Sequence, residues 1–335
     1  MSDSQPAAPV APAAPVGEDV ALAIRGLVKI YGNLIAVADL SLDIPTGSFY
    51  GIVGPNGAGK TTTLTMATGL LTPDKGTAYV HGVDVWGDTQ RARGLLGVMP
   101  DGMRLLDRLS GPDFLVHVGM LHGLDASVAR ERAHELLAAL DLAEAGKKLI
   151  SDYSAGMTKK IALAAALIHS PRVLVLDEPF EAVDPVSATN IRQILTDYTK
   201  RGGTVILSSH VMATVQQLCT HVAIIDKGRV LVAGTTDEVA QGGDLGERFT
   251  SLVGGVHSEE GLSWLGNWFA SSSASSGTRF AARLPCWCWP PSASCTSVGS
   301  MRPCSWAQHS LLNPREQRPL RRCCPSWVPL SSSCG

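Results

Sequence analysis

The chain lacks any apolar run long enough to cross a membrane as a helix. Its longest such runs, for example residues 161–168, fall far short of the about 20 residues that a bilayer requires. The first residues also lack the basic and apolar regions of a secretory signal peptide. Neither sign of charge is in excess, since 28 Lys and Arg stand against 30 Asp and Glu, and nothing predicts a nucleic-acid partner. We therefore expect a soluble globular protein that reaches a membrane only through a partner.

Cysteine is scarce through most of the chain and abundant at its end. Residues 21–250 contain only Cys219, whereas residues 251–335 hold seven of the eight cysteines and neither Lys nor Asp. The spacing of those cysteines fits no zinc site, and the segment has neither helical nor strand periodicity. We interpret 251–335 as disordered, or as an out-of-frame reading of GC-rich DNA, rather than as a disulfide or metal module. Residues 1–20, rich in Ala and Pro, predict a flexible tail.

Between these ends, short apolar runs bounded by Gly or Pro alternate with helical patterns. The runs at 48–53, 173–176, 204–207 and 221–225 are typical of buried parallel strands, and 228–234 is typical of a further strand. Helical stripes occur within 131–143 and through Phe114, Val118 and Leu121. This alternation predicts an α/β domain over 21–250 whose mainly parallel sheet is covered on both faces. The block from about 90 to 165 is mostly helical and predicts an inserted helical subdomain.

The most specific motif is an octapeptide that fits the pattern G-x-x-x-x-G-K-[ST] without a mismatch. It reads Gly54-Pro55-Asn56-Gly57-Ala58-Gly59-Lys60-Thr61, between an apolar run and a helix-compatible segment. Its glycines let successive N–H groups point at phosphate oxygens. We expect Lys60 to reach the β- and γ-phosphates of ATP, Thr61 to ligate Mg²⁺ and Thr62 to donate to a neighbouring phosphate oxygen. The spacing and both flanks disfavour a glycine-rich turn that merely joins a strand to a helix.

Two acids follow the apolar run 173–176, namely Asp177 and Glu178. A buried strand delivers side chains to its carboxyl end, where ligands bind in open α/β sheets. We expect Asp177 to hold Mg²⁺ through water and Glu178 to polarise the attacking water as a general base. A strand that ends in an acid is a weak signal by itself, and the phosphate motif strengthens it.

With the segment before these acids, the chain resembles the ATP-binding-cassette (ABC) ATPases. Tyr153-Ser154-Ala155-Gly156-Met157 stands where that family carries its Leu-Ser-Gly-Gly-Gln signature, and two of the five positions match. The resemblance implies a P-loop NTPase fold, with a mainly parallel sheet, an antiparallel N-terminal β portion and an inserted helical subdomain. It also implies that Ser154 and Gly156 face the γ-phosphate of an ATP held by a second copy, in a head-to-tail dimer.

Three further positions agree with the family pattern, and each role is what the resemblance implies. Asp184, just after the acid pair, resembles the family's D-loop residue at the dimer seam. His210 follows the next predicted strand, where the family places a histidine that senses the γ-phosphate. Tyr31 precedes the phosphate motif where the family's A-loop aromatic stacks on adenine. A lone histidine or tyrosine would otherwise be an ordinary satisfied polar group or core residue.

Two positions depart from the family pattern. The family usually carries glutamine after the strand that leads into the helical subdomain, and this chain has Asp101 there. Its carboxylate still offers an oxygen ligand to Mg²⁺ but adds negative charge beside a polyphosphate. The signature is also altered, at Ala155 and Met157. These departures put the efficiency of hydrolysis in doubt more than its existence.

The resemblance covers about residues 21–250 and implies an ATP-hydrolysing subunit that powers a separate membrane permease. The domain closes soon after Thr235 without a convincing regulatory domain, which resembles the exporter-type class. A cytoplasmic location, peripheral on the inner face of the plasma membrane, is implied. Three alternatives stay open, namely a soluble ABC ATPase regulator without a permease, a different P-loop enzyme such as a kinase or helicase, and a cassette impaired in hydrolysis.

Overall fold

A computed structural model of the chain describes residues 17, 19–146 and 148–254. The predictions for 1–20 and 251–335 therefore lie almost entirely outside the described residues. Regular structure begins with β1 (Val20–Tyr31) and ends with α9 (Leu245–Val253). Regular elements thus reach slightly beyond the expected limits of 21 and 250, and the division of the chain into domains stays a prediction.

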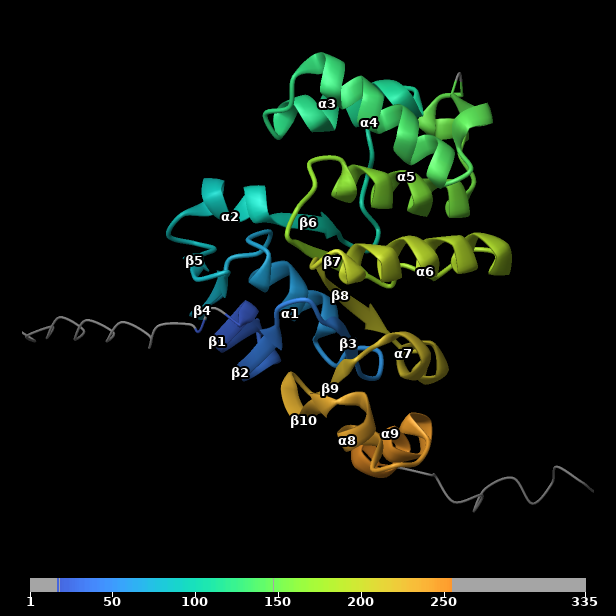
Figure 1. Cartoon of the computed structure of the whole chain (residues 1–335). Helices are drawn as coiled ribbons and strands as arrows, with labels where there is room; N and C mark the ends of the chain where they lie inside the picture. The colour runs from blue at the N-terminus through green and yellow to red at the C-terminus, as the bar shows by residue number, and fades with distance from the viewer. Residues whose placement is uncertain (1–16, 18, 147, 255–335) are drawn as a thin grey trace, which may run out of the picture. The chain divides into compact units, whose positions relative to one another are not determined.

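A six-stranded sheet lies at the centre, with the strand order β10-β9-β3-β8-β7-β6 (Figure 1). Neighbours from β9 to β6 pair in parallel, and β10 pairs antiparallel with β9. Strands β3, β7 and β8 are buried along their whole length, as apolar runs in a covered parallel sheet should be. The expected strands are confirmed as β3 (Phe49–Val53), β7 (Val173–Asp177), β8 (Thr204–Ser209), β9 (His221–Asp226) and β10 (Arg229–Thr235), with β6 (Leu96–Met99) at the edge.

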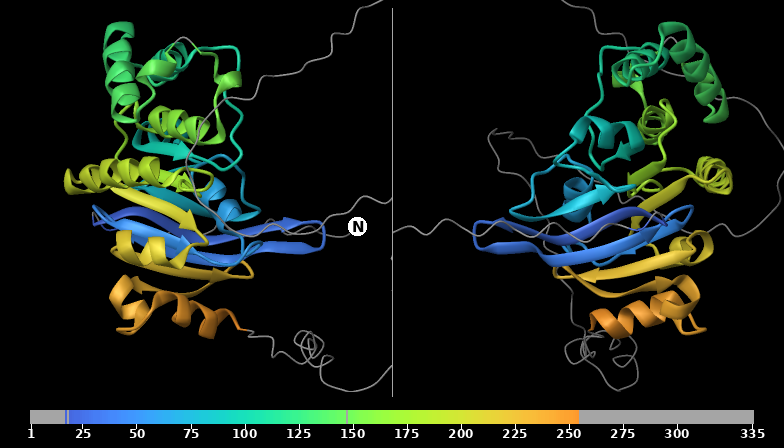
Figure 2. Two further views of the ribbon diagram at one scale, coloured as in Figure 1. Left: turned by 90° about the vertical axis from the view of Figure 1, so that its right-hand side faces the viewer. Right: turned by 60° about the vertical axis from the view of Figure 1, so that its left-hand side comes forward.

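A second, antiparallel sheet has the order β2-β1-β4-β5. It adds β2 (Leu34–Pro45), β4 (Lys75–Val80) and β5 (Val83–Asp84) to β1. In both views of Figure 2 the blue β1–β2 hairpin extends beyond its neighbouring strands. Helix α1 (Lys60–Ala67) contributes Leu64 and Met66 to one buried cluster with Ile24 of β1 and Ile52 of β3. The α/β fold with an antiparallel N-terminal portion is therefore confirmed.

Helices cover the other face of the main sheet. Alternate residues of β7 point to opposite sides, since Leu174 and Leu176 pack in the helix-side cluster whereas Val173 and Val175 pack in the cluster of the second sheet. The helices on this face are α3 (Gly111–Leu121), α4 (Ala126–Ala139), α5 (Ala155–Leu167), α6 (Pro185–Lys200), α7 (Met212–Leu218) and α8 (Thr236–Ala240), with 3₁₀ turns at Ala143–Ala145 and Ile150–Asp152. Helix α2 (Thr89–Leu95) packs instead with the second sheet. Within the described ranges, none of these helices has the length and apolar character to traverse a bilayer.

The segment expected to be a helical subdomain lies between two neighbouring strands. Helices α3, α4 and α5 contact one another and stand together beside β6 and β7 (Figure 1). Two details of the expected helices are wrong. The helix predicted over 131–143 ends at Ala139, because Asp141 takes a left-handed conformation with φ 55°. Leu121, expected on a buried stripe, is 74% exposed at the end of α3.

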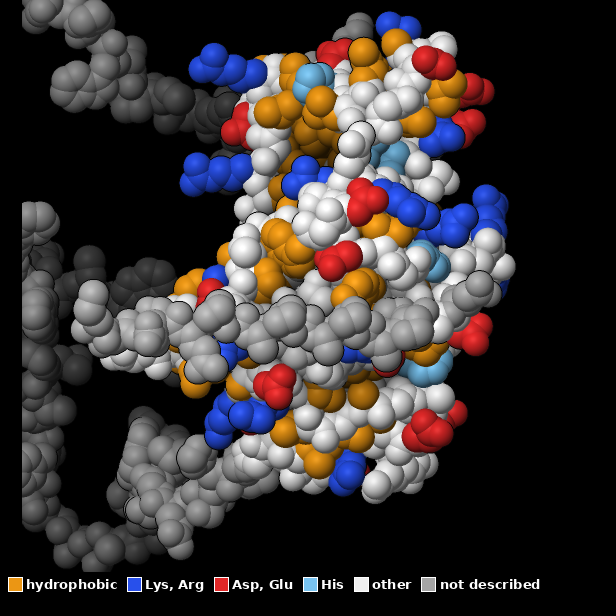
Figure 3. All heavy atoms as spheres, turned by 90° about the vertical axis from the view of Figure 1, so that its left-hand side faces the viewer, with side chains coloured by type: hydrophobic (Ala, Val, Ile, Leu, Met, Phe, Trp, Pro, Cys, Tyr) orange, Lys and Arg blue, Asp and Glu red, His pale blue; other side chains and the backbone are white. Residues whose placement is uncertain are grey.

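Charged side chains of both signs are distributed over the face in Figure 3, where blue and red groups stand among orange apolar ones. Apolar exposure is concentrated at the free end of the β1–β2 hairpin. There, Ile30, Tyr31, Leu34 and Ile35 are each at least 45% exposed. The hairpin therefore presents an unusually apolar end for a surface element.

Candidate nucleotide site

The loop of residues 54–59 joins β3 to α1 in a conformation that requires glycine. Gly57 and Gly59 have φ of 81° and 97°, in the left-handed region that other residues rarely adopt. A side chain at Gly54 would collide with β9, because its Cβ would lie 2.3 Å from the carbonyl oxygen of Ile225. Gly59 caps α1 without a side-chain hydrogen bond, so the first N–H groups of the helix stay available to an anion.

Lys60 is the first residue of α1 and is only 7% exposed. Its Nζ donates to the carbonyl oxygens of Gly54 at 2.8 Å and Pro55 at 3.4 Å. The ammonium group therefore lies inside the curve of the loop, held by the two residues that begin it. Thr61, next on the helix, is exposed.

The turn between β9 and β10 supports the loop from behind. The N–H of Gly228 donates to the carbonyl of Ala58, and the N–H of Ala38 in β2 donates to the carbonyl of Gly228, both at 2.9 Å. The base of the β1–β2 hairpin therefore packs on the phosphate loop. Tyr31 lies at the end of that hairpin, 49% exposed, with Lys29 Nζ 5.8 Å from its ring centroid.

Asp177 ends β7 as one of the few buried acids, 3% exposed. Ser208 Oγ on the neighbouring strand donates to Asp177 Oδ1 at 2.5 Å and accepts from the N–H of Glu178 at 2.9 Å. Asp177 Oδ2 is also buried and has no hydrogen-bond partner among the described residues. Hard cations favour carboxylate and hydroxyl oxygens, so this free oxygen and the exposed Thr61 hydroxyl suit a divalent cation.

Ser208 is a residue of the candidate site that the sequence analysis did not single out. Its role comes from strand register, since Asp177 and Ser208 are direct partners across the β7–β8 pair. The sequence does show a polar residue near the end of each of these two strands. It does not show that the strands are neighbours in the sheet, so the contact between Asp177 and Ser208 could not be predicted.

Glu178 and His210, which the sequence analysis singled out separately, lie in contact. His210 Nδ1 lies 3.1 Å from Glu178 Oε1. The Glu178 backbone has φ 47°, a left-handed conformation that strains an ordinary residue and that folded proteins keep mainly at functional sites. The Glu178 side chain is 15% exposed, so a base at this position keeps limited access to water.

Asp101 pairs with a lysine that the sequence analysis did not single out. Lys159 Nζ donates to Asp101 Oδ1 at 2.9 Å and to the carbonyl oxygen of Glu178 at 3.1 Å. The hydrogen bond from Lys159 lowers the pKa of Asp101 below its usual value, against a smaller opposing effect of burial. The ammonium group of Lys159 thus balances the negative charge of Asp101. The same group connects α5 to the backbone of Glu178.

Ser154 and Asp184 lie at the beginnings of two helices rather than at the phosphate loop. Ser154 Oγ caps α5 by accepting from the N–H of Met157 at 3.3 Å, and Asp184 caps α6 by accepting from the N–H of Ser187 at 3.0 Å. The Ser187 hydroxyl and N–H also lower the pKa of Asp184. Ser154 and Asp184 are exposed and Gly156 is partly exposed. Among the described residues, no hydrogen bond joins Ser154 or Asp184 to residues 54–61.

Comparisons with known proteins agree with this geometry. A family model described as ABC transporter matches residues 37–181. Over 219 residues the chain is 40% identical to the daunorubicin/doxorubicin resistance ATP-binding protein of Streptomyces peucetius, covering 65% of this chain and 66% of that protein. Over 225 residues it is 35% identical to the linearmycin resistance ATP-binding protein of Bacillus subtilis, covering 67% and 72%.

Solved structures show the same fold. The ATP-binding subunit of an ABC transporter matches with a TM-score of 0.66 and 25% identity, over 70% of this chain and 99% of that one. An ATP-binding cassette in a dimeric post-hydrolysis state with ADP and Pi matches with a TM-score of 0.60 and 22% identity, over 64% and 98%.

Proposed function

This chain belongs to the ATP-binding subunits of ABC transporters, which hydrolyse ATP to drive transport, and we propose that it powers export of a small organic molecule. The relatives named above confer resistance to daunorubicin, doxorubicin and linearmycin, which supports an exporter for drug-like compounds. The proposal includes a separate membrane permease, and therefore a position on the inner face of the plasma membrane. The resistance functions of these relatives carry the export proposal, and the Glu178–His210 contact, 3.1 Å long, supports the ATP hydrolysis that would drive it.

In the proposed mechanism, Glu178 is the general base that takes a proton from the attacking water. Ser208 and Lys159 hold its backbone from two sides, through the N–H and the carbonyl. His210 Nδ1 contacts the same carboxylate, and the half-exposed ring has no second hydrogen-bond partner among the described residues, so Nε2 is proposed to contact the γ-phosphate. Loss of that phosphate would remove the contact, so His210 is proposed to sense the state of the nucleotide.

The phosphate chain is proposed to lie over residues 54–61. When ATP binds, Lys60 Nζ would donate to phosphate oxygens instead of to the carbonyl oxygens of Gly54 and Pro55. The new hydrogen bonds would be stronger because both partners are charged. Asp177 and Thr61 would hold Mg²⁺, which when bound neutralises phosphate charge. Asp101 is proposed to join them through Oδ2, since its Oδ1 accepts from Lys159. Tyr31 is proposed to stack on adenine, because its hairpin packs on the loop at its base.

A second copy is proposed to complete the site. Ser154 and Asp184 are positioned by their helices but are exposed. Gly156 lies within the first turn of α5, where N–H groups favour an anion. In a head-to-tail dimer, these residues would meet the γ-phosphate on the partner copy.

The test of export uses everted membrane vesicles that contain this chain and a permease that co-purifies with it. ATP-dependent accumulation of daunorubicin inside such vesicles is the expected result, and Lys60→Ala should abolish it. If the detergent-extracted chain brings down no integral membrane protein and the vesicles accumulate nothing, the export proposal is wrong. A soluble regulator would then be the better interpretation.

A further inference from the structure

A cavity of about 870 Å³ lies at the edge of the main sheet opposite to the phosphate loop. Thr46, Arg172 and Gly203 line it, and they come just before strands β3, β7 and β8. Asp177, His210 and residues 54–59 come at or after the carboxyl ends of these strands. Because these strands are parallel, the cavity and the nucleotide site lie at opposite edges of the sheet. The cavity size is within the about 300–1,000 Å³ range of small-molecule sites.

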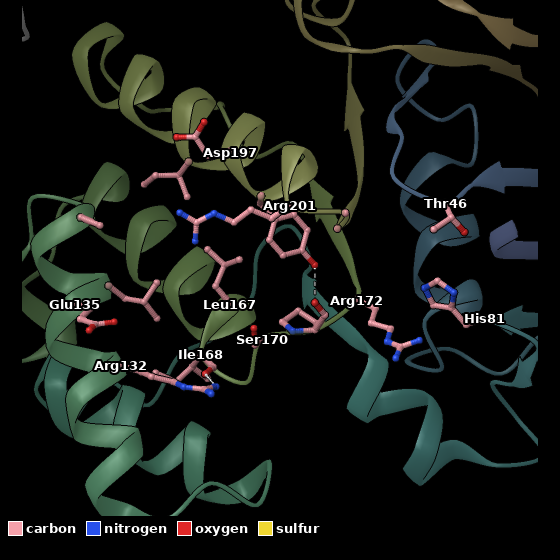
Figure 4. A pocket seen from close by; sticks show the side chains of 17 residues that line it. Thr46, His81, Arg132, Glu135, Leu167, Ile168, Ser170, Arg172, Asp197 and Arg201 are labelled. Carbon is pink, nitrogen blue, oxygen red and sulfur yellow. Dashed lines mark hydrogen bonds between the residues drawn. The ribbon is translucent and has the colours of Figure 1, made fainter. Parts of the chain in front are cut away.

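Three arginines from different elements line this cavity, which we call the arginine pocket (Figure 4). Arg132 comes from α4, Arg172 precedes β7, and Arg201 follows α6. Arg132 Nη1 donates to the carbonyl oxygen of Ile168 at 2.9 Å, which holds the guanidinium at the end of α5. Within the described part of the chain, no carboxylate lies within 4.0 Å of any of the three.

A histidine adds a neutral polar group beside Arg172. Burial, and then the charge of Arg172, lowers the pKa of His81, so the ring is neutral at pH 7. Its Nε2 is buried and has no hydrogen-bond partner among the described residues. In Figure 4 the guanidinium of Arg172 and the ring of His81 lie on one side of the pocket, and Arg132 and Arg201 lie on the other.

The acids of the pocket offset these charges only in part. Asp197 accepts two hydrogen bonds from Gln193 Nε2 at 3.0 Å, and Lys200 Nζ lies 3.6 Å away. The hydrogen bond from Gln193, and then the charges of Lys200 and Arg201, lower the pKa of Asp197, so its charge is shared between the pocket and groups outside it. Glu135 is the remaining acid of the lining. The three arginines outnumber the two acids of the lining, Glu135 and Asp197, so the pocket carries a net positive charge.

The rest of the lining is largely apolar and comes from three helices. It includes Leu136 of α4, Leu167 of α5, and Ile194 and Tyr198 of α6. The Tyr198 hydroxyl donates to the carbonyl oxygen of Pro171 at 2.7 Å, which fixes the ring in the wall. Apolar walls with a few convergent polar groups are the usual construction of a small-molecule site.

We propose that the arginine pocket binds a drug-sized organic anion with more than one acidic group. Its acidic groups would contact Arg132 and Arg201 on one side and Arg172 on the other, and its apolar body would lie against Leu136, Leu167 and Ile194. Guanidinium groups suit carboxylate, sulfonate and phosphate groups alike.

Such a ligand would act on the nucleotide site through two helices. Helix α5 begins at the Ser154 cap and ends at Leu167, and α6 begins at the Asp184 cap and ends just before Arg201. The carboxyl ends of both helices therefore lie at the arginine pocket, and their amino ends carry the residues that the proposed dimer uses. A ligand that fixes one end of each helix biases the position of the other end.

The test is a fluorescence titration of the full chain with bis-ANS, an apolar dianion, at saturating ADP so that the nucleotide site is filled. The triple variant Arg132→Gln/Arg172→Gln/Arg201→Gln should bind the probe at least about tenfold more weakly, since each lost charge-assisted contact contributes. Ala139→Trp, which fills the pocket from α4 and keeps all arginines, should weaken binding similarly. The matched control Arg91→Gln/Arg104→Gln/Arg229→Gln removes the same charge from exposed positions elsewhere and should bind as the unmodified chain does.

Arginines also stabilise the carboxyl ends of helices, and the titration separates this role from ligand binding. A triple variant that melts at a lower temperature yet binds bis-ANS with unchanged affinity would overturn the proposal. So would a control variant that loses affinity as much as the triple variant, because binding would then follow net charge alone.

Discussion

The buried half of the nucleotide site, around Lys60 and Asp177, and the exposed helix caps Ser154 and Asp184 reach their conformations by different means. The half of the site that contains Lys60 and Asp177 is enclosed, since these side chains are 7% and 3% exposed, and it is built on strands β3, β7 and β8 of the main sheet. Ser154 and Asp184 are exposed and are fixed only by the helices that they cap. The sheet thus holds one half of the site rigidly. The helix caps Ser154 and Asp184 lie at the surface, where only a second molecule can bring a phosphate to them.

The largest expected effect concerns the enclosed half. Glu178→Gln removes the base but keeps the size of the side chain and the backbone contacts to Ser208 and Lys159. We expect turnover to fall about 10²–10⁴-fold while ATP binding survives. Phosphate release and binding of a fluorescent ATP analogue measure the two quantities. Unchanged turnover would reject Glu178 as the base.

Lys60→Ala should act on binding rather than on chemistry alone. The loss of charge-assisted contacts to phosphate, about 1.5–3 kcal/mol each, should weaken ATP affinity about tenfold to a hundredfold. A titration with the fluorescent ATP analogue measures the change. Lys75→Gln, at the exposed start of β4, is the control and should leave affinity as it is. Equal affinities of the two variants would contradict the position assigned to Lys60.

Ser154→Asp tests the exposed half by adding a charge without removing the helix cap. Aspartate caps helices as well as serine does, so the melting temperature should change little. Turnover should fall about tenfold, because the carboxylate would oppose the γ-phosphate of the partner copy. Ser154→Asn caps equally and adds no charge, and it should keep most of the turnover. If both variants hydrolyse ATP equally well, Ser154 does not face phosphate.

The smallest expected effect concerns Lys159, which joins helix α5 to Asp101 and Glu178. Lys159→Gln removes the ammonium group that joins Asp101 to the carbonyl of Glu178, and turnover should fall about threefold with ATP affinity unchanged. A half-exposed ion pair contributes only about 0–1 kcal/mol to stability, so melting should barely change. In a double-mutant cycle with Asp101→Asn, the two substitutions should be non-additive in turnover. Strict additivity would show that Asp101 and Lys159 affect turnover independently and would contradict the coupling proposed here.

The enclosed half was predictable because its residues are adjacent in sequence. Residues 54–61 carry the glycines that the loop needs, and Gly57 and Gly59 do adopt positive φ. Ser208 was missed because its contact with Asp177 depends on which strands are neighbours, which no single segment reveals. The left-handed turn at Asp141 ended a helix that the apolar pattern alone would have continued, since Leu140 and Leu142 are buried on both sides of it.

Lys159 was missed for a similar reason. Its partners, Asp101 and Glu178, lie 58 and 19 residues away in the chain. The sequence indicated that Asp101 departs from the family pattern, but the compensating cation became visible only once α5 was placed beside β6 and β7. Local motifs predict local geometry, whereas charge balance between segments is decided by packing.

The central claim is that a second copy completes the site, and sedimentation velocity of the Glu178→Gln variant tests it most directly. This variant keeps ATP bound, so the shared γ-phosphate should hold two copies together. The account predicts dimers with ATP and Mg²⁺, monomers with ADP, and monomers in both conditions once Ser154→Asp is added. A variant that stays monomeric with saturating ATP, or that dimerises regardless of Ser154→Asp, would contradict it.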